Sequence, residues 1–246
     1  NRCMRTTRVI SAIGVCLVLL GTALGAVPMQ ADTSVRAYSS SSSSKDNFTI
    51  TSYTADMELG RDSEKRSTLK TKLTITANFP PEQNHGLAPE FVTQYKGHHT
   101  SFALGSVQDE HGNDYEYSWS GNTLRIGNKD TYVSGSKTYV ITYTQRDVTW
   151  NYGDTQKNEF YWDVIGTSWR VPISNATATL KLSPELAAIS RTTPQCYTGK
   201  QGSRTTCTVT SPSSDTITAS VGYLAPYAGM TLAVGFPQGT FAEYKK

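Results

Sequence analysis

The chain has 246 residues, of which 37% are hydrophobic and 10% aromatic, and its formal net charge is +3. A chain of this length can bury a sizeable core in one large or two small domains, so folding requires neither a metal nor a dense disulfide network. Arg2, Arg5 and Arg8 carry the only charges before Asp32, and without these three the net charge falls from +3 to zero. A neutral body lacks the basic surface on which phosphate binding depends, which excludes nucleic acid as an expected partner.

Residues 1–31 are predicted to form a signal peptide or an N-terminal membrane anchor. Basic residues precede the apolar run Val9–Ala26, and a polar segment follows, which is typical of a secretory signal. Cleavage after Gly25 would release the body, whereas an uncleaved segment would anchor it. Residues 32–45 contain the serine run Ser39–Ser44 and are predicted to be a linker.

The body, residues 46–241, is predicted to be all-β and to fold as an antiparallel β-sandwich. In STLKTKLTITANF, apolar residues alternate with polar ones from Leu69 to Asn78, which is the period of a half-buried strand. Residues 82–97 break this pattern and are predicted to form a long loop with a turn at His85 and Gly86. The predicted strands are NFTITSYTADMEL, STLKTKLTITANF, SFALGSV, YEYSW, TLRIG, TYVITYTQR, FYWDV, ATATLKLS, TTCTVT, TITASV and MTLAVGF.

Short strands separated by turn residues, with no convincing helix and no fixed repeat, favour a sandwich over a propeller or a solenoid. TYVITY has β-prone residues on both faces and is expected to be an inner strand. The body is one large sandwich or two small ones. A division between two subdomains would fall near residues 172–175, where Pro172 disfavours a central strand.

Cys196 and Cys207 are predicted to form a disulfide. They are an even pair in an exported segment, QCYTGKQGSRTTC, and ten residues separate them. Closing such a loop stabilises a domain by roughly 2–4 kcal/mol. A metal site would need further ligands, and this segment contains no histidine.

The stretch FYWDVIGTSWRVPI holds the candidate binding residues Trp169, Tyr161, Trp162 and Arg170. In a strand, Phe160 and Trp162 share one face, while Tyr161 and Asp163 share the other. Two interpretations follow for the tryptophans. They fill the sandwich core, where a large aromatic side chain buries the most area, or Trp169 lies at a rim and stacks on a sugar or a peptide.

Signals of catalysis are weak. The sequence has no G-x-S-x-G nucleophile motif, and its four histidines fall in predicted loops without a metal-binding spacing. We therefore expect no metal and no cofactor, and solvated or locally hydrogen-bonded histidines. DEHGND lacks the spacing of a calcium loop and is predicted to be a polar hairpin turn. Glu159 and Asp163 are the first carboxylates to consider for a glycosidase, although sequence does not give their separation.

Several segments, in chain order, resemble one known family. They are HGL at residues 85–87, LRIGNKDTYVSGSKTYVITY, FYWDVIGTSWRVPI, CYTGKQGSRTTC and LAVGFPQGTF. They look like the DUF2207 family of predicted bacterial membrane proteins over residues 47–241, and members from candidate-phylum bacteria such as the Saccharibacteria look particularly similar. The most specific parts of the resemblance are the RIG, VSG and TYVITY elements, YWDV-x-G-x-x-W and VGFPQGTF.

The resemblance implies an exported β-rich region followed by one or more transmembrane helices. Residues 242–246 are therefore expected to begin a linker to a transmembrane helix beyond Lys246. The family often continues its His-Gly motif with an aromatic residue and Arg, then Ile-Pro, whereas this chain reads HGLAPEFVTQY. The role of that arginine is not carried over, and the family brings no established reaction.

Together these features favour a noncatalytic, membrane-anchored ectodomain on the extracytoplasmic face of the membrane or at the cell surface. Its expected partners are the membrane itself and a component of the cell wall or a surface protein. One alternative is a secreted or tethered carbohydrate-active hydrolase that uses Glu159 and Asp163. Another is a structural spacer.

Overall fold

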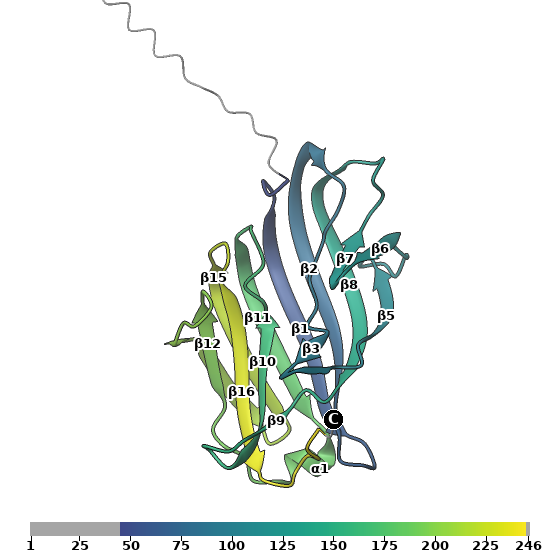
Figure 1. The fold of residues 1–246 in the computed structure, drawn as a ribbon. Helices are drawn as coiled ribbons and strands as arrows, with labels where there is room; N and C mark the ends of the chain where they lie inside the picture. The colour runs from purple at the N-terminus through teal and green to yellow at the C-terminus, as the bar shows by residue number, and fades with distance from the viewer. Residues whose placement is uncertain (1–44, 245–246) are drawn as a thin grey trace, which may run out of the picture. The chain divides into compact units, whose positions relative to one another are not determined.

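The computed structural model describes residues 45–244. The predicted signal or anchor at residues 1–31 lies outside the described residues, as do residues 32–44 of the predicted linker and the last two residues of the chain. The described body is an all-β sandwich of two large sheets with two small hairpins and a single short helix, as Figure 1 shows.

The larger sheet has seven strands, and its order places the first strand in the middle. In sheet order the strands are β14 (Thr208–Ser213), β15 (Thr216–Leu224), β11 (Ile173–Leu182), β1 (Thr49–Arg61), β2 (Ser67–Asn84), β8 (Val133–Arg146) and β5 (Ala103–Gln108). β1 and β11 pair in parallel, whereas the other neighbours in this sheet are antiparallel. β8 lies between β2 and β5, which confirms the prediction that TYVITY belongs to an inner strand.

The second layer is a five-stranded antiparallel sheet. Its order is β13 (Thr205–Thr206), β12 (Gln195–Gly199), β16 (Gly229–Pro237), β10 (Lys157–Ile165) and β9 (Trp150–Tyr152). The remaining elements are the hairpin of β3 (Gln94–Tyr95) and β4 (His98–His99), the hairpin of β6 (Tyr117–Ser120) and β7 (Thr123–Ile126), and helix α1 (Pro184–Ala187). Both sheets combine strands from before and after residues 172–175.

The core lies between the two sheets because their strands alternate in polarity. In β1, Tyr53, Ala55, Met57 and Leu59 are buried, and the residues between them are partly or fully exposed. On the outer face the register sets opposite charges side by side, with Asp56 opposite Lys72 of β2. Cross-strand pairs of this kind favour one register, since a shift by one residue would turn the apolar set outward.

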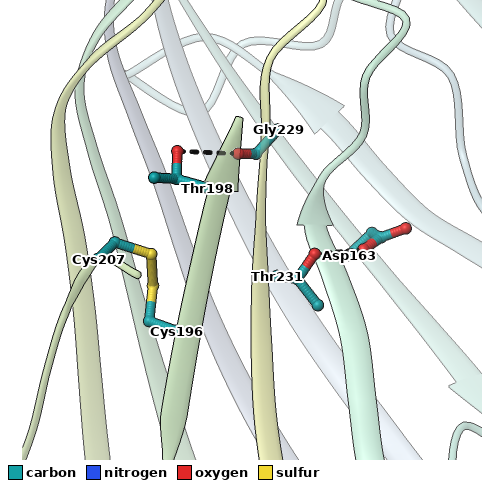
Figure 2. Close-up of a disulfide and its surroundings, with 6 residues drawn as sticks. All are labelled: Asp163, Cys196, Thr198, Cys207, Gly229 and Thr231. Atoms are coloured by element: carbon teal, nitrogen blue, oxygen red, sulfur yellow. Dashed lines mark hydrogen bonds between the residues drawn. A yellow bond between two sulfur atoms is a disulfide. The ribbon is translucent and has the colours of Figure 1, made fainter. Parts of the chain in front are cut away.

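The disulfide predicted between Cys196 and Cys207 is present and sits where the chain changes sheets. Cys196 belongs to β12 of the five-stranded sheet, and Cys207 lies between β13 and the start of β14 in the seven-stranded sheet. The backbone amide of Cys207 also donates to the Cys196 carbonyl at 2.9 Å. Figure 2 shows the sulfur bridge beside β12. It therefore closes the hairpin and fixes this crossover.

The segment after residue 79 differs from its prediction. β2 does not end there but continues through Pro80 and Pro81 to Asn84, and its pairing with β8 becomes irregular between Phe79 and Asn84. Proline lacks an amide donor, so strands tolerate it where the ladder is interrupted. The predicted loop at residues 82–97 is also tied to β7, because Leu87 pairs with Ile126 in an isolated antiparallel bridge.

The two ends of the described chain leave from opposite ends of β2. The Asn84 side chain, at the end of β2, donates to the Lys45 carbonyl at 2.9 Å. The Tyr244 ring stacks on His98, which bonds to Asp147, and the Asp147 amide donates to Ser67 at the start of β2. In Figure 1, β1 begins at the top and the chain ends at the bottom, beside α1. Within residues 45–244, no helix is long and apolar enough to cross a bilayer.

Candidate functional site

A groove of about 880 Å³ opens at the end of the sandwich where β1 begins. It collects loops that are far apart in the sequence: the N-terminal entry to β1, the end of β2 and the residues after it, β7 with its following loop, and the loop after β10. Its lining residues are Lys45, Asp46, Phe48, residues 82–88, Glu90, Ser118, Thr123, residues 125–127, Lys129, Tyr132 and residues 168–171. Trp169 and Arg170, two of the predicted binding residues, lie in this groove.

Two glycines that pack against each other, Gly86 and Gly127, line the groove. A Cβ added to Gly86 would lie 1.9 Å from the Ile126 carbonyl oxygen, and one added to Gly127 would lie 2.0 Å from the His85 carbonyl oxygen. Both residues have positive φ angles, +137° and +122°, which favour glycine. This crossing brings together HGL and RIG, two of the motifs quoted for the family, and so holds His85 and the β7 backbone beside the groove.

Trp169 lies partly in the core and partly at the groove. Its ring meets the buried Tyr53 edge to face at a centroid distance of 6.3 Å, and the side chain is half-buried. The Trp169 carbonyl accepts a hydrogen bond of 2.7 Å from the Tyr227 amide. Trp169 therefore packs on the core through Tyr53 and also lines the groove, and its stacking on a ligand stays a prediction.

A stacked pair of rings provides a second aromatic surface in the groove. The rings of His85 and Tyr132 lie 4.5 Å apart with an interplanar angle of 25°. The His85 Nδ1 bonds to the Thr131 carbonyl at 3.0 Å, so Nδ1 carries the proton and Nε2 remains an acceptor in the neutral ring. Tyr132 is 55% exposed, which leaves its ring accessible to a ligand.

Charges of both signs line the groove. Arg170 lies 3.7 Å from the carboxylate of Asp46, and both side chains are largely exposed. Arg125 is exposed on β7, and Glu82 and Glu90 lie on the segment across from it. Exposed ion pairs are weak, generally below about 1 kcal/mol, so a ligand can compete for these groups. The lining is therefore suited to a ligand with both donors and acceptors.

The other two predicted binding residues lie outside the groove lining. Phe160 and Trp162 face the core, with 0% and 4% exposure, which confirms the predicted alternation of β10. The Trp162 ring packs against Tyr95 at 5.5 Å. Tyr161 faces out from the five-stranded sheet and is 40% exposed. The structure thus separates the four candidates into a groove pair, a core tryptophan and a residue on the open sheet face.

Tyr161 is part of a cluster of tyrosines on and beside that open face. Its ring lies 6.3 Å from the ring of Tyr197 on β12, and its carbonyl accepts a hydrogen bond of 3.1 Å from the Tyr95 hydroxyl. The Lys96 ammonium lies 4.9 Å from the centre of the Tyr152 ring. Burial and the nearby Asp163 carboxylate raise the pKa of the Tyr161 phenol, so it is a neutral hydroxyl at physiological pH.

Glu159 and Asp163, the carboxylates of the hydrolase alternative, flank Tyr161 on the same face of β10. Four residues of strand separate their Cα atoms by about 13 Å. Glu159 accepts a hydrogen bond from Thr155 at 2.8 Å, and Asp163 accepts one from Thr231 at 2.5 Å. Figure 2 shows the Thr231 hydroxyl turned toward Asp163 between β16 and β10. Neither carboxylate lines the groove.

Sequence reasoning missed a buried polar cluster beside the start of β2, at the opposite end of that strand from the groove. His98 and Thr100 run beside Gln145 and Asp147, and all four are at most 5% exposed. The His98 Nε2 donates to the Asp147 carbonyl at 2.8 Å, and Gln145 donates to the Thr100 hydroxyl at 2.9 Å. The prediction of a solvated or locally bonded loop residue is therefore wrong for His98, whose partner is 49 residues away. Nothing in the local pattern around HH signals this burial.

DEHGND forms the predicted turn, in which the Asp109 carboxylate accepts hydrogen bonds from the Asn113 side chain and from the backbone amides of Asn113 and His111. The bond from the Asn113 side chain, followed by the backbone bonds, lowers the pKa of Asp109. Among the residues that the structure describes, no group of three or more His, Cys, Asp or Glu side chains is placed to hold a metal ion.

Comparison with known proteins matches the body to one family. Residues 49–236 match the model described as "Predicted membrane protein (DUF2207) N-terminal domain". A search of curated proteins found no match.

Solved structures with a related arrangement include the M1 zinc metallopeptidase from Deinococcus radiodurans, with 12% identity and a TM-score of 0.43, covering 76% of this chain and 42% of that one. Another is native leukotriene A4 hydrolase from Saccharomyces cerevisiae, with 11% identity and a TM-score of 0.45, covering 76% of this chain and 29% of that one. The chain thus spans less than half the length of these proteins.

Proposed function

The chain belongs to the DUF2207 family of predicted membrane proteins, and we propose that its β-sandwich is a noncatalytic ectodomain that binds a protein segment of the cell envelope in the groove beside Trp169. The observation that carries this proposal is the convergence of Trp169, Arg170 and the stacked His85 and Tyr132 rings in one concavity. Concave sites with aromatic walls and a few polar groups are the usual form of binding sites.

The chemistry of the groove supports a peptide-like ligand. Arg125 and Arg170 can receive carboxylates or carbonyls, while Glu82 and Glu90 can receive amide or ammonium donors. A protein segment presents both kinds of group along with apolar side chains for the aromatic walls. A strongly anionic polymer would meet these two glutamates as well as the arginines, and is therefore disfavoured.

The disulfide supports an extracytoplasmic position for the body, because such bonds persist in oxidising compartments. In this proposal the membrane segments hold the ectodomain at the cell surface, and the groove makes the contact. Protease added to intact cells should then digest the body while a cytoplasmic marker survives. Protection of the body in intact cells would place it on the other side of the membrane.

The groove is tested by capturing envelope material on immobilised protein. Material bound by the native chain should be lost after protease treatment of the envelope fraction and kept after glycan removal. Trp169→Ala should reduce the captured amount severalfold. Because this side chain also packs on Tyr53, Arg125→Glu serves as a second variant that alters the groove from an exposed position.

Tyr223→Ala is the matched control, since Tyr223 is 61% exposed on β15 and lies outside the groove lining. Thermal melts of all variants separate lost binding from lost folding. Capture that is unchanged in both groove variants would contradict the proposal. Absence of any captured protein would favour the structural spacer instead.

A further inference from the structure

We propose a second, independent binding site: the outer face of the five-stranded sheet, where Tyr161 and Tyr197 form a flat surface for a neutral saccharide chain. This face is separate from the groove, whose lining includes neither tyrosine. The two sites take different chemical classes of ligand, and neither proposal depends on the other.

The register of the sheet explains how the two rings come together. Tyr161 lies opposite Ala233 of β16, and Tyr197 lies opposite Thr231 of the same strand. Both β16 residues are small, so the two tyrosine rings reach across that strand to a centroid distance of 6.3 Å with a tilt of 32°. Larger side chains at these β16 positions would hold the rings apart. The result is a pair of tilted tyrosine rings on the outer face of the sheet.

The backbone beneath Tyr161 is fixed although it lies at a sheet edge. β9 pairs with β10 only at residues 157–159, which leaves the carbonyl of Tyr161 without a strand partner on that side. The Tyr95 hydroxyl donates to this carbonyl at 3.1 Å and closes the edge. Tyr161 thus stands on a strand whose position is held on both sides, and rigid aromatic groups bind with little loss of conformational entropy.

The polar groups around the rings indicate which ligand fits. Glu159 and Asp163 lie two residues to either side of Tyr161, and no ion pair found among residues 45–244 involves either of them. Each carboxylate accepts one threonine hydroxyl and retains further acceptor sites. A pyranose ring has an apolar C–H face that stacks on an aromatic ring and a rim of hydroxyl donors for such carboxylates.

Charge complementarity commits the surface to one class of saccharide. The two carboxylates repel a uronic acid or a phosphate polymer, whereas neutral hydroxyl and acetamido groups supply the donors that they lack. The Lys96 ammonium lies over the Tyr152 and Tyr95 rings, and Lys157 lies at the start of β10 on the same face as the two carboxylates. The surface therefore favours a neutral hexose or N-acetylhexosamine chain over an anionic one.

The test uses the full chain in detergent micelles with three defined probes. These are a β-1,4-linked N-acetylglucosamine hexamer, a β-1,4-glucan hexamer and polygalacturonate as the anionic polymer. Binding is measured by calorimetry or by ligand-observed NMR. We expect at least one neutral hexamer to bind and polygalacturonate not to bind. Tyr161→Ala and Tyr197→Ala should each raise the Kd by about tenfold, the loss of one aromatic contact.

Matched variants separate stacking from folding and from the groove. Tyr161→Phe keeps the ring and should retain binding, while Tyr223→Ala removes an exposed tyrosine of the other sheet and should leave the Kd unchanged. Trp169→Ala should also leave saccharide binding intact. The proposal is overturned if neither hexamer binds, if polygalacturonate binds better, or if Tyr161→Ala and Tyr223→Ala behave alike. Each of these results leaves the peptide groove to be judged by its own experiment.

Discussion

Gly86 and Gly127 occupy tightly constrained backbone positions beside the groove. A Cβ on Gly86 would clash with the carbonyl of Ile126, and a Cβ on Gly127 would clash with the carbonyl of His85. Gly86→Ala or Gly127→Ala would place a Cβ about 2 Å from a backbone carbonyl oxygen, at a position with positive φ. We expect either change to lower the free energy of unfolding by about 2–4 kcal/mol. Denaturant unfolding monitored by tryptophan fluorescence measures this loss.

Gly112 provides the control for these substitutions. It also has a positive φ, +86°, but a Cβ there would meet no atom within 4 Å. Gly112→Ala should cost only the conformational strain, about 1 kcal/mol. If Gly86→Ala proved no more harmful than Gly112→Ala, the close crossing of HGL and RIG would not be a constraint on this fold.

Tyr143 gives the fold a dependence on alkaline pH. Its ring packs against Phe91 and Phe102 at about 5 Å, and burial raises the pKa of its phenol to about 12. The folded pKa lies above the ordinary value of about 10, so the folded state holds the proton more tightly. The stabilisation is fully present below pH of about 10 and is lost as the pH rises toward about 12.

We therefore expect the free energy of unfolding to fall with pH in this window, by up to about 1.4 kcal/mol per unit of pKa shift. Tyr143→Phe should make that fall shallower, and Tyr223→Phe, at an exposed position, should not. Urea unfolding at several alkaline pH values provides the slopes. Equal slopes for the native chain and Tyr143→Phe would show that this phenol does not contribute.

At the scale of single elements, the disulfide joins β12 to the start of β14 and so links the two sheets through a short covalent path. Replacing both cysteines with serine should lower the free energy of unfolding by roughly 2–4 kcal/mol. Reduction of the native chain should give a similar loss, measured by thermal or denaturant unfolding. A double variant as stable as the native chain would mean that the crossover is held by other contacts.

Elements with a strict two-residue period were predictable because polarity alone determines which face of a strand is buried. This is why the sequence indicated which face of β2 is buried, and that Trp162 and Tyr161 lie on opposite faces of β10. Pairing between distant strands leaves no such local trace. The parallel contact of β1 with β11, which joins Tyr53 to Ala176 in register, therefore could not be read from either strand.

The candidate site was predicted in part for the same reason. Trp169 and Arg170 stood out as an aromatic and a cationic residue beside a loop, and the structure places both in the groove. Their neighbours His85 and Tyr132 come from segments that meet through the glycine crossing. The length of β2 was mispredicted because Pro80 and Pro81 are typical of a loop. In the structure, an irregularity in the pairing of β2 with β8 accommodates these prolines within the strand.

For the molecule as a whole, both sheets depend on both halves of the chain. β1 lies beside β11 in one sheet, and β10 lies beside β16 in the other. We expect the fragments 45–172 and 173–244 each to remain unfolded when expressed alone, and to regain structure when mixed. Circular dichroism and NMR dispersion would report this. Independent folding of either fragment would instead support two subdomains divided near residues 172–175.

The opposite exits of the described chain bear on how the body responds to a pulling force. A load applied at Lys45 and Tyr244 reaches β1 at one end of the sandwich and β16 at the other. Each of these strands is interior to its sheet, with a neighbour on both sides. The load therefore runs along their hydrogen-bond ladders and must shear many bonds together, instead of opening them one at a time. We therefore expect a body pulled by these two ends to resist mechanical unfolding.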